Sequence, residues 1–388
     1  MSDWKEKICS YVDKIRPQIV ALSKDIHAAP ELKFEEHKAS RWLADALTTE
    51  GFHVELGAAG LDTALIATHP EISDGPTIAI LGEYDALPEL GHACGHNLIA
   101  GASLGACLAL GKVKADLPGK LIFFGTPAEE GGGGKVIMVQ AGLFDDIDAA
   151  MIFHPSNRTM VTRGSLAITE VEIAFTGRPA HASGSPEKGI NALDAVIQTF
   201  NGINALRQHI KDGSRIHGII TNGGSKPNIV PEHAAALFYV RAQETSYRDE
   251  LLEKLHSCAQ GAALATGAEL SLSKIGHEYK AMKENHTFAA AFKKNLEMLG
   301  IEVGPPSGGL GSTDMGDVSH IVPAIHPYIA ICSEEIVGHS HEFAEAAGSE
   351  RGYDVMISAA KALAMTAIDL FIDSDLMRRI KAEDDSVR

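Results

Sequence analysis

The stretch TIAILGEYDALPELGHACGHNLIAGASLGACLAL, residues 77–110, runs from an apolar segment through a polar loop into a second apolar segment. Residues 77–82 form a nearly continuous apolar run, which is typical of a strand buried on both faces of a sheet. Residues 97–110 are apolar and rich in small side chains, which predicts a buried, closely packed helix. In an open α/β sheet, ligands bind beyond the carboxyl ends of the strands, so we expect the polar loop to face a ligand.

The segments on either side of this stretch also alternate between predicted strands and predicted helices. The strands are predicted at residues 63–69, 120–126, 149–155 and 324–332, and the helices at residues 4–29, 285–300 and 350–373. Because strands alternate with helices, the sequence predicts an α/β fold with a mostly parallel central sheet and helices on both faces.

The middle of the chain has a different pattern. Residues 167–177 alternate between apolar and polar side chains, as in a half-exposed strand. Further elements are predicted as a helix at 190–210, strands at 215–224 and 234–242, a helix at 247–267 and a strand at 269–275. This β-α-β-β-α-β order predicts a ferredoxin-like α+β domain over residues 167–276. It would be inserted into a discontinuous first domain made of residues 1–166 and 277–388.

The composition limits the classes of partner. A length of 388 residues exceeds what one hydrophobic core usually holds, which favours two domains. The net charge of −17, from 51 acidic and 34 basic side chains, argues against a nucleic-acid partner. The N-terminus lacks an apolar signal core, and no run of 18 apolar residues occurs, so no membrane partner is expected. Five scattered cysteines suggest reduced thiols in a cytoplasm.

Polar side chains follow four of the predicted strands, at the point where each strand ends. In chain order they are Glu83 and Asp85, then Glu129 and Glu130, then His154, then His339 and His341. Together with Cys94 and His96 in the polar loop, they supply carboxylate, thiol and imidazole groups. This is the ligand set of a borderline-soft metal such as zinc.

The segment GHACGHN, residues 91–97, has two interpretations. Residues two apart share a face only in an extended or irregular backbone, so Cys94 and His96 can serve one site only if this segment is not helical. Gly91 and Gly95 allow such a backbone at little cost in free energy, because glycine has no side chain that restricts it. Asn97 would then cap the following helix. The alternative is a buried cysteine flanked by surface histidines.

The adjacent carboxylates of PAEEGGGG, residues 127–134, also have two interpretations. In an extended turn, Glu129 and Glu130 diverge, so one can bind a metal while the other acts as general base on a water molecule. A solvated surface turn is the alternative. Four glycines would let the backbone pass close to a ligand, but the strand–GxxxxGK[ST]–helix pattern of a phosphate loop is not present.

Several motifs resemble one known family. They are GEYDALPELGHACGHN, PAEEGGGG, FTGRPAHAS followed by GINALDA, NGGSKPNIVPEHAAALFYVR, and GSTDMGDVSHIVPAIHP followed by GHSHEF. In this order they resemble the aminoacylase and glutamate-carboxypeptidase metallopeptidases (metallopeptidase family 20) over almost the whole chain. Within that family they are similar to the amidohydrolase branch, which includes p-aminobenzoyl-glutamate hydrolase subunits and β-alanyl-lysine dipeptidases.

The resemblance implies a two-metal catalytic domain with an inserted lid that also forms a homodimer or higher oligomer. The implied metal ligands are Cys94, His96, Glu130, His154 and His339. Glu129 would be the general base, and Asp85 would orient a ligand histidine. From the lid, His181 would stabilise the oxyanion in a neighbouring subunit's site, and Asn228 and Arg241 would contact the substrate carboxylate, with Thr313 near the substrate.

The implied cofactors are two divalent ions, with zinc expected and manganese as the alternative. The implied reaction is hydrolysis of an amide in a small peptide or acyl-amino-acid conjugate with a free carboxylate. An aryl amide hydrolase of the p-aminobenzoyl-glutamate type is the first alternative. A cysteine hydrolase that uses Cys94 with His92 or His96, and a catalytically silent binding subunit, are the others.

Two positions depart from the pattern of the family. Glu83 stands where most branches have a metal-binding histidine. Asn97 stands where the amidohydrolase branch usually has aspartate, and we expect it to cap the helix. His92 and His341 have no expected role.

Overall fold

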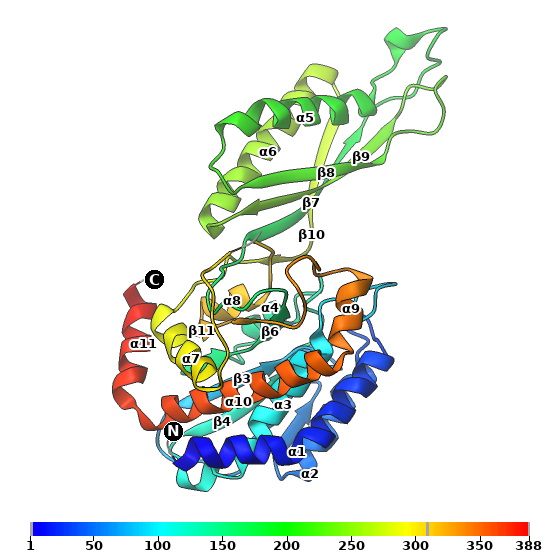
Figure 1. Ribbon diagram of the computed structural model, residues 1–388. Coiled ribbons are helices and arrows are strands. Elements are labelled where there is room, and N and C mark those ends of the chain that lie inside the picture. Colours follow the sequence, from blue (N-terminus) through cyan, green and yellow to red (C-terminus); the bar gives the residue numbers. More distant parts are fainter. Residues whose placement is uncertain (1–2, 308–309, 387–388) are drawn as a thin grey trace. The chain divides into compact units, whose positions relative to one another are not determined.

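The computed structural model describes residues 3–307 and 310–386, which form two compact units (Figure 1). The first unit comprises Met1–Gly164, Met282–Leu310 and Asp314–Arg388, and the second comprises Ser165–Ala281 and Gly311–Thr313. Each unit has its own hydrophobic core. The chain leaves the first unit at residue 164 and returns at 282, compared with the predicted positions of 166 and 277.

The first unit is built on a six-stranded, mostly parallel sheet with the order β1-β2-β4-β3-β5-β11. Its strands are β1 (His53–Leu56), β2 (Leu65–Thr68), β3 (Thr77–Gly82), β4 (Lys120–Gly125), β5 (Ala149–Met151) and β11 (Ala324–Ile325). The pairs β3–β4, β3–β5 and β5–β11 are parallel, whereas β1 and β2 add antiparallel strands at one edge. Because β3 lies in the middle and is covered on both faces, its apolar run is fully buried.

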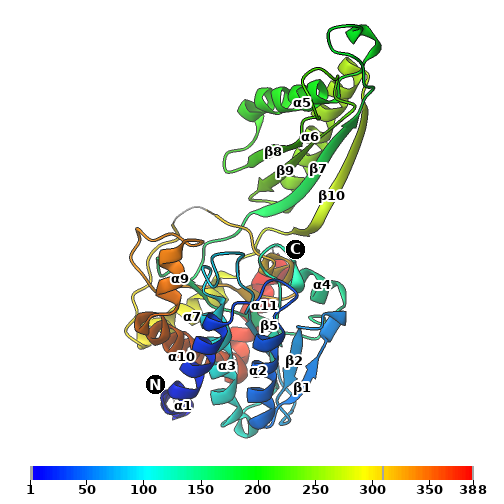
Figure 2. The same cartoon turned by 90° about the vertical axis from the view of Figure 1, so that its right-hand side faces the viewer.

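Helices α1 (Asp3–Ala28), α3 (His96–Gly111) and α10 (Glu350–Ile372) pack against one another (Figure 2), and α3 and α10 also contact β3 of this sheet. The small residues of α3 allow this packing. A Cβ on Gly101 would lie 2.4 Å from Met356 Sδ, and one on Gly105 would lie 2.6 Å from Ile19 Cδ1. Helix α10 is long and apolar enough to cross a membrane, but most of it is buried within the first unit, as expected for a core helix.

The first unit contains several further elements. They are α2 (His37–Thr49), α4 (Gly134–Gln140), β6 (His154–Ser156), α7 (His286–Met298), α8 (Met315–Ser319), β12 (Tyr328–Ala330), α9 (His341–Ala347), α11 (Ser374–Ser386), and the short 3-10 helices η1 (Ala58–Gly60) and η2 (Lys114–Asp116). The single strand predicted at 324–332 is wrong. Pro327 divides it into β11, in the large sheet, and β12, which pairs with β6 in a separate small sheet.

The second unit is an antiparallel sheet covered by two helices. In chain order it contains β7 (Ala167–Thr176), η3 (Pro186–Lys188), α5 (Ala192–Leu206), η4 (Arg207–His209), β8 (Arg215–Asn222), β9 (His233–Ala242), α6 (Thr245–Thr266) and β10 (Glu269–Tyr279). The strand order is β10-β7-β9-β8, so β8 is an edge strand. Alternate residues of β7 are buried against α5 and α6, which explains the period-two pattern in its sequence.

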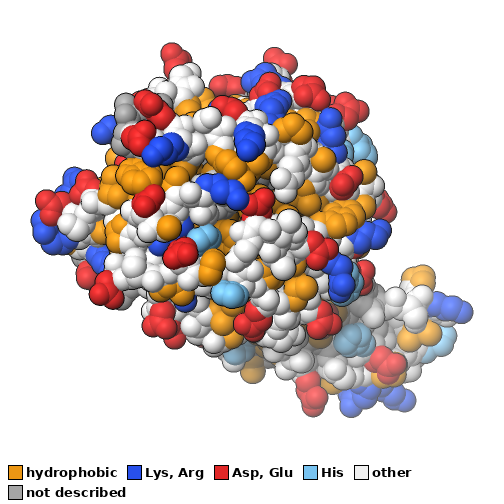
Figure 3. Space-filling view, turned by 90° about the horizontal axis from the view of Figure 1, so that it is seen from below, with side chains coloured by type: hydrophobic (Ala, Val, Ile, Leu, Met, Phe, Trp, Pro, Cys, Tyr) orange, Lys and Arg blue, Asp and Glu red, His pale blue; other side chains and the backbone are white. Residues whose placement is uncertain are grey.

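Charges are mixed on the surface shown in Figure 3. Among the described residues on this face, Lys and Arg side chains alternate with Asp and Glu and do not gather into a continuous basic patch.

Candidate metal centre and active site

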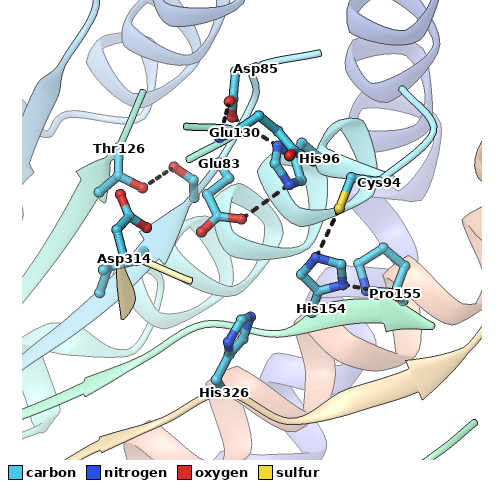
Figure 4. A network of polar contacts seen from close by, with 12 residues as sticks. Glu83, Asp85, Cys94, His96, Thr126, Glu130, His154, Pro155, Asp314 and His326 are labelled. Carbon is cyan, nitrogen blue, oxygen red and sulfur yellow. Dashed lines mark hydrogen bonds and ion pairs between the residues drawn. The ribbon is translucent and has the colours of Figure 1, made fainter. Parts of the chain in front are cut away.

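The carboxyl ends of the central strands bring the site together. Because β3, β4, β5 and β11 are mutually parallel, the residues that follow them meet at one edge of the sheet. These residues are Glu83 and Asp85 after β3, Glu129 and Glu130 after β4, His154 after β5, and His326 after β11. Figure 4 shows side chains from these strand ends converging with Cys94 and His96.

Cys94 and His96 reach this edge through an irregular turn, as predicted. The turn ends at Gly95, whose left-handed backbone (φ 78°) makes it the N-cap residue of α3. The expected cap at Asn97 is therefore wrong, because α3 begins one residue earlier at His96. Asn97 is buried instead, and its side-chain amide donates to Ser23 Oγ and to the carbonyl oxygen of Ala347, each at 3.0 Å.

The five side chains predicted to bind metal form overlapping groups. The groups are Cys94, His96 and His154; Cys94, Glu130 and His339; and His96, Glu129 and Glu130, with the potential ligand atoms of each group within 4.8 Å of one another. Cys94 Sγ lies 3.3 Å from His154 Nε2, and His339 Nε2 lies 3.2 Å from Glu130 Oε1. Cys94, His96 and Glu130 each belong to two of these groups, so the candidate ligands form one continuous cluster.

Outer hydrogen bonds orient the histidines of the cluster. Asp85 Oδ1 lies 2.8 Å from His96 Nδ1, and the carbonyl oxygen of Pro155 lies 2.6 Å from His154 Nδ1. When each ring carries its proton on Nδ1, this N–H donates to the carboxylate or carbonyl oxygen just named. The lone pair on each Nε2 then faces the cluster, as in metal-binding histidines. The buried Nε2 of His96 has no hydrogen-bond partner among the described residues. An unsatisfied buried nitrogen among thiol and carboxylate groups fits a metal ligand.

Burial and close charges shift the pKa values of the cluster. Burial raises the pKa of the Cys94 thiol well above its usual value, and the charge of Glu130 adds to this. Burial alone would lower the pKa of His96, but Asp85 and Cys94 outweigh it and raise that pKa. Burial, followed by the charge of Glu83, raises the pKa of Glu129, so its carboxyl can hold a proton more readily than an exposed one. That property suits a group that takes up and returns a proton.

A buried lysine compensates the acidic side chains beside this cluster. Lys135 Nζ donates to Glu83 Oε1 at 2.6 Å and to Asp314 Oδ1 at 2.8 Å, and all three side chains are fully buried. The backbone N–H of Lys135 also donates to Asp314 Oδ2 at 3.0 Å. Glu83 Oε2 lies 3.5 Å from His96 Nε2, so the network reaches the predicted metal ligands. Glu83 is therefore paired with an ammonium group, where most family branches are expected to have a ligand.

Sequence reasoning did not identify Lys135, Asp314 or His326. Lys135 follows the four glycines, Asp314 follows Thr313, and His326 lies inside the strand predicted at residues 324–332. The sequence signal for these three residues was their position inside or directly after the motifs that resemble the family. Burial lowers the pKa of His326 to about 3, so its ring is neutral.

The predicted lid residues occupy two separate places in the second unit. His181 pairs with Ile229, and Ala182 N–H donates to the carbonyl oxygen of Asn228 at 3.1 Å, so His181 and Asn228 lie together. At the other end of β9, an Arg241 N–H donates to Ser312 Oγ at 3.0 Å, next to Thr313.

The length of β9 keeps these two places apart. Arg241 pairs with Ile168 at the start of β7, whereas His233 pairs with Thr176 at its end. Eight strand residues at about 3.3 Å each separate Arg241 from His233 by roughly 26 Å, and Asn228 precedes His233. Asn228 and Arg241 of the same chain therefore lie too far apart to contact one carboxylate, and the two could contact one substrate only if they came from two copies of the chain.

The chain is similar in sequence and fold to known proteins. Residues 79–362 match the model of the peptidase family M20/M25/M40. The chain is 39% identical to the Xaa-Arg dipeptidase of Mus musculus, over 98% of this chain and 91% of that protein. It is 30% identical to a p-aminobenzoyl-glutamate hydrolase subunit of Escherichia coli K12, over 97% and 94%. A dinuclear metal-binding M20 peptidase from Bacillus subtilis has a similar fold, with a TM-score of 0.71 at 21% identity over 92% and 99% of the two chains.

Proposed function

We propose a mechanism and a substrate class from the premise that this chain belongs to the peptidase family M20/M25/M40. As a member, it is a hydrolase that cleaves amide bonds in small peptides or acyl amino acids. The proposal concerns the residues that perform this reaction, the ions that they hold and the substrate that they select.

Cys94, His96, Glu130, His154 and His339 would hold two divalent ions. The convergence of these five side chains is the observation that carries the proposal. Thiolate and imidazole ligands favour zinc, with manganese as the alternative. Bound there, such ions supply Lewis acidity and acidify a water molecule.

Glu129 is the proposed general base. It is adjacent to the ligand Glu130, and burial keeps its pKa raised. Glu129 takes a proton from the attacking water and returns it to the leaving amine, and His181 of a neighbouring copy donates a hydrogen bond to the developing oxyanion. Asp85 holds His96 in the required tautomer and also accepts the backbone N–H of Glu130 at 2.9 Å.

Nucleophilic chemistry at Cys94 is the weaker alternative. A free nucleophile needs a lowered thiol pKa, whereas burial raises that of Cys94. His92 is a poor base for this thiol, because burial lowers the pKa of its imidazole to about 3. A chelator separates the two mechanisms: it abolishes metal-assisted hydrolysis and leaves a cysteine mechanism intact.

We propose dipeptides with a basic C-terminal residue as the substrate class. The Xaa-Arg dipeptidases of mouse and human, at 39% and 37% identity, support this choice. A p-aminobenzoyl-glutamate conjugate is the alternative, supported by the Escherichia coli protein at 30%.

The second unit would act as a lid and as the dimer contact of a cytoplasmic homodimer. Its edge strand β8 presents Ile219, with 65% of the residue exposed, and Ile220 beside it. An exposed apolar edge strand is a surface that pairs readily with another copy.

The proposed cytoplasmic location rests on the cysteines. All five cysteines are free, which suits a reducing compartment. Fractionation of the source cells tests this location.

A substrate panel with a Glu129→Gln control tests the proposed function. The metal-loaded protein is incubated with Xaa-Arg and Xaa-Lys dipeptides, acyl amino acids and p-aminobenzoyl-glutamate, and the released amino acid is measured. We expect turnover of the basic dipeptides, and a loss of at least 10²-fold in kcat for Glu129→Gln with unchanged metal content. Near-normal activity of that variant contradicts the assignment of the base, and no turnover of any substrate indicates a catalytically silent protein.

A further inference from the structure

His339 lies in an irregular segment, residues 331–340, that joins β12 to α9 and is called the His339 segment below. His339 itself has a left-handed backbone (φ 62°), which costs free energy for a residue with a side chain. Such a conformation persists only where surrounding contacts impose it. After His339, Ser340 is the N-cap of α9, and its hydroxyl accepts the N–H of Phe343 at 3.1 Å. The contacts that hold the segment before His339 therefore decide where this imidazole lies.

Asn157 holds the His339 segment by two backbone carbonyl groups. Its Nδ2 donates to the carbonyl oxygen of Glu334 at 2.9 Å and to that of Ile336 at 2.8 Å. Three residues after Ile336, the backbone N–H of His339 donates to the carbonyl oxygen of Ala93 at 2.9 Å. The segment is therefore fixed by Asn157 before His339 and by Ala93 at His339.

Asn157 also lies next to another proposed ligand. It directly follows β6, the strand that begins at His154. Figure 4 shows the imidazole of His154 facing Cys94, whose Sγ lies 3.3 Å from Nε2 of that ring. Cys94 belongs to one candidate group with His154 and to another with Glu130 and His339. Asn157 therefore joins the strand that carries a ligand of one group to the segment that carries a ligand of the other.

We propose that Asn157 is a positioning residue for His339. By donating to the two carbonyl groups, its amide holds the His339 segment beside β6, so that His339 Nε2 stays 3.2 Å from Glu130 Oε1. Without this amide the left-handed backbone of His339 can relax, and the imidazole leaves Cys94 and Glu130, while the ligands of the other group keep their positions. This inference rests on the proposed two-ion centre, to which it adds the residue that holds one ligand in place.

Zinc titration of the metal-free protein tests this inference without relying on activity. Zn²⁺ is titrated in competition with a chromophoric chelator, which gives a separate affinity for each ion. We expect Asn157→Asp, which keeps the size of the side chain and removes its N–H donors, to weaken one of the two ions by about 10–100-fold and to leave the other unchanged. Asn157→Ala, which adds no charge, should have the same effect on the same ion.

His339→Ala identifies the affected ion. It should weaken the ion that the Asn157 variants weaken, and combining it with Asn157→Asp should cause no further loss, because Asn157 acts through His339. Arg158→Gln is the matched control. Arg158 is the next residue along the chain and pairs with the exposed carboxylate of Glu334 in the same segment at 2.8 Å. An exposed ion pair contributes little, so both affinities should stay unchanged in this control.

Three results would overturn this inference. A merely structural role of Asn157 would lower the thermal midpoint and weaken both ions equally. A loss that adds fully to that of His339→Ala would show that Asn157 does not act through His339. Unchanged affinities in both Asn157 variants would show that the amide is not needed. Failure of the proposed metal centre is a different result, in which the unsubstituted protein binds no Zn²⁺ or His339→Ala keeps both of its affinities.

Discussion

Single side chains in this site connect elements that are far apart in the sequence. The two oxygens of Asp85 accept hydrogen bonds from His96 Nδ1 and from the backbone N–H of Glu130, at 2.8 and 2.9 Å. One carboxylate therefore fixes both the proposed ligand His96 on α3 and the turn that follows β4. Because a metal centre tolerates little displacement of its ligands, this positioning matters as much as the ligands themselves.

His92 and Cys94 provide a comparison at this scale. His92 Nε2 lies 3.0 Å from the carbonyl oxygen of Ile26 in α1, whereas Cys94 Sγ faces His154. We expect Cys94→Ala to lose at least one equivalent of metal, and His92→Ala to keep its metal and lose only stability. Elemental analysis of the dialysed proteins measures both. Equal metal loss from the two variants would contradict this division of roles.

Glu36 is a buried acid that holds the turn before Glu129. It accepts the N–H of Ala128 and the hydroxyl of Thr63, each at 2.8 Å. Ala128 has a left-handed backbone (φ 60°), a conformation that costs free energy for a residue with a side chain. Burial, followed by the charge of Asp85, raises the pKa of Glu36 to about 7.

This pKa predicts how stability depends on pH. The folded pKa lies above the ordinary value of 4.5, so the stabilising contribution is complete below about pH 4.5 and is lost as the pH rises through 7. From pH 5 to pH 8, the metal-free protein should lose up to about 3 kcal/mol that Glu36→Gln does not lose. Urea unfolding at both pH values measures this difference. Glu35→Gln, at the exposed neighbour, is the matched control, and an identical pH slope for Glu36→Gln would contradict the prediction.

At the scale of elements, the turn with four glycines and helix α4 lie next to the carboxylates of Glu129 and Glu130, which are proposed to act in catalysis. The turn joins β4 to α4, and Lys135 in the first turn of α4 carries the ion pairs to Glu83 and Asp314. The chain folds back closely here, because a Cβ on Gly134 would lie 1.9 Å from the carbonyl oxygen of Pro127. The close approach of the Pro127 backbone, two residues before Glu129, therefore requires glycine at position 134.

Gly134→Ala tests this close approach. The added methyl group must displace Pro127, and a shift of about 1 Å at Glu129 can lower kcat by roughly 10²-fold. The measurement is kcat together with the thermal midpoint. Gly261→Ala on α6 is the control, since its Cβ would meet no atom within 4 Å and alanine favours a helix. Unchanged kcat in Gly134→Ala would show that the turn tolerates the displacement.

At the scale of the whole molecule, the second unit separates two sets of predicted substrate contacts. His181 and Asn228 lie beyond one end of its sheet, and Arg241 lies at the other. A strand of this length prevents both sets from serving one small substrate within one chain. An active assembly that uses both sets therefore needs a second copy of the chain.

Ile219→Lys on the edge strand β8 tests that assembly. A charge at this exposed position blocks edge pairing, so the protein should change from dimer to monomer in analytical ultracentrifugation. If His181 acts in the partner's site, hydrolysis should fall at least 10-fold while metal content stays constant. Leu264→Lys on α6, where 87% of the residue is exposed, is the control that should keep both mass and activity. A variant with the mass of the unsubstituted protein would argue against β8 as the contact.

The local pattern of apolar and polar residues determined the main strands and helices of this protein and the edge of the sheet where the site lies. The apolar run of β3 and the small residues of α3 predict a buried strand and a packed helix, because burial imposes these periodicities on any chain. The ends of the parallel strands then predict that Glu130, His154 and the segment from Cys94 to His96 meet at one edge. The structure brings these side chains within ligand distance of one another.

Only the tertiary structure decided which side chains pair across long distances in the sequence. Lys135 joins Glu83, 52 residues away, and Asp314, 179 residues away, and no local pattern specifies such a pairing. Asn97 is a buried link to Ser23 and Ala347, and not a cap, because Gly95 takes the left-handed conformation first. His326 enters the site because Pro327 divides a predicted strand between two sheets. Hydrophobic periodicity acts along the chain, whereas charge compensation and hydrogen-bond pairing act through space, so the folded structure alone specifies these partners.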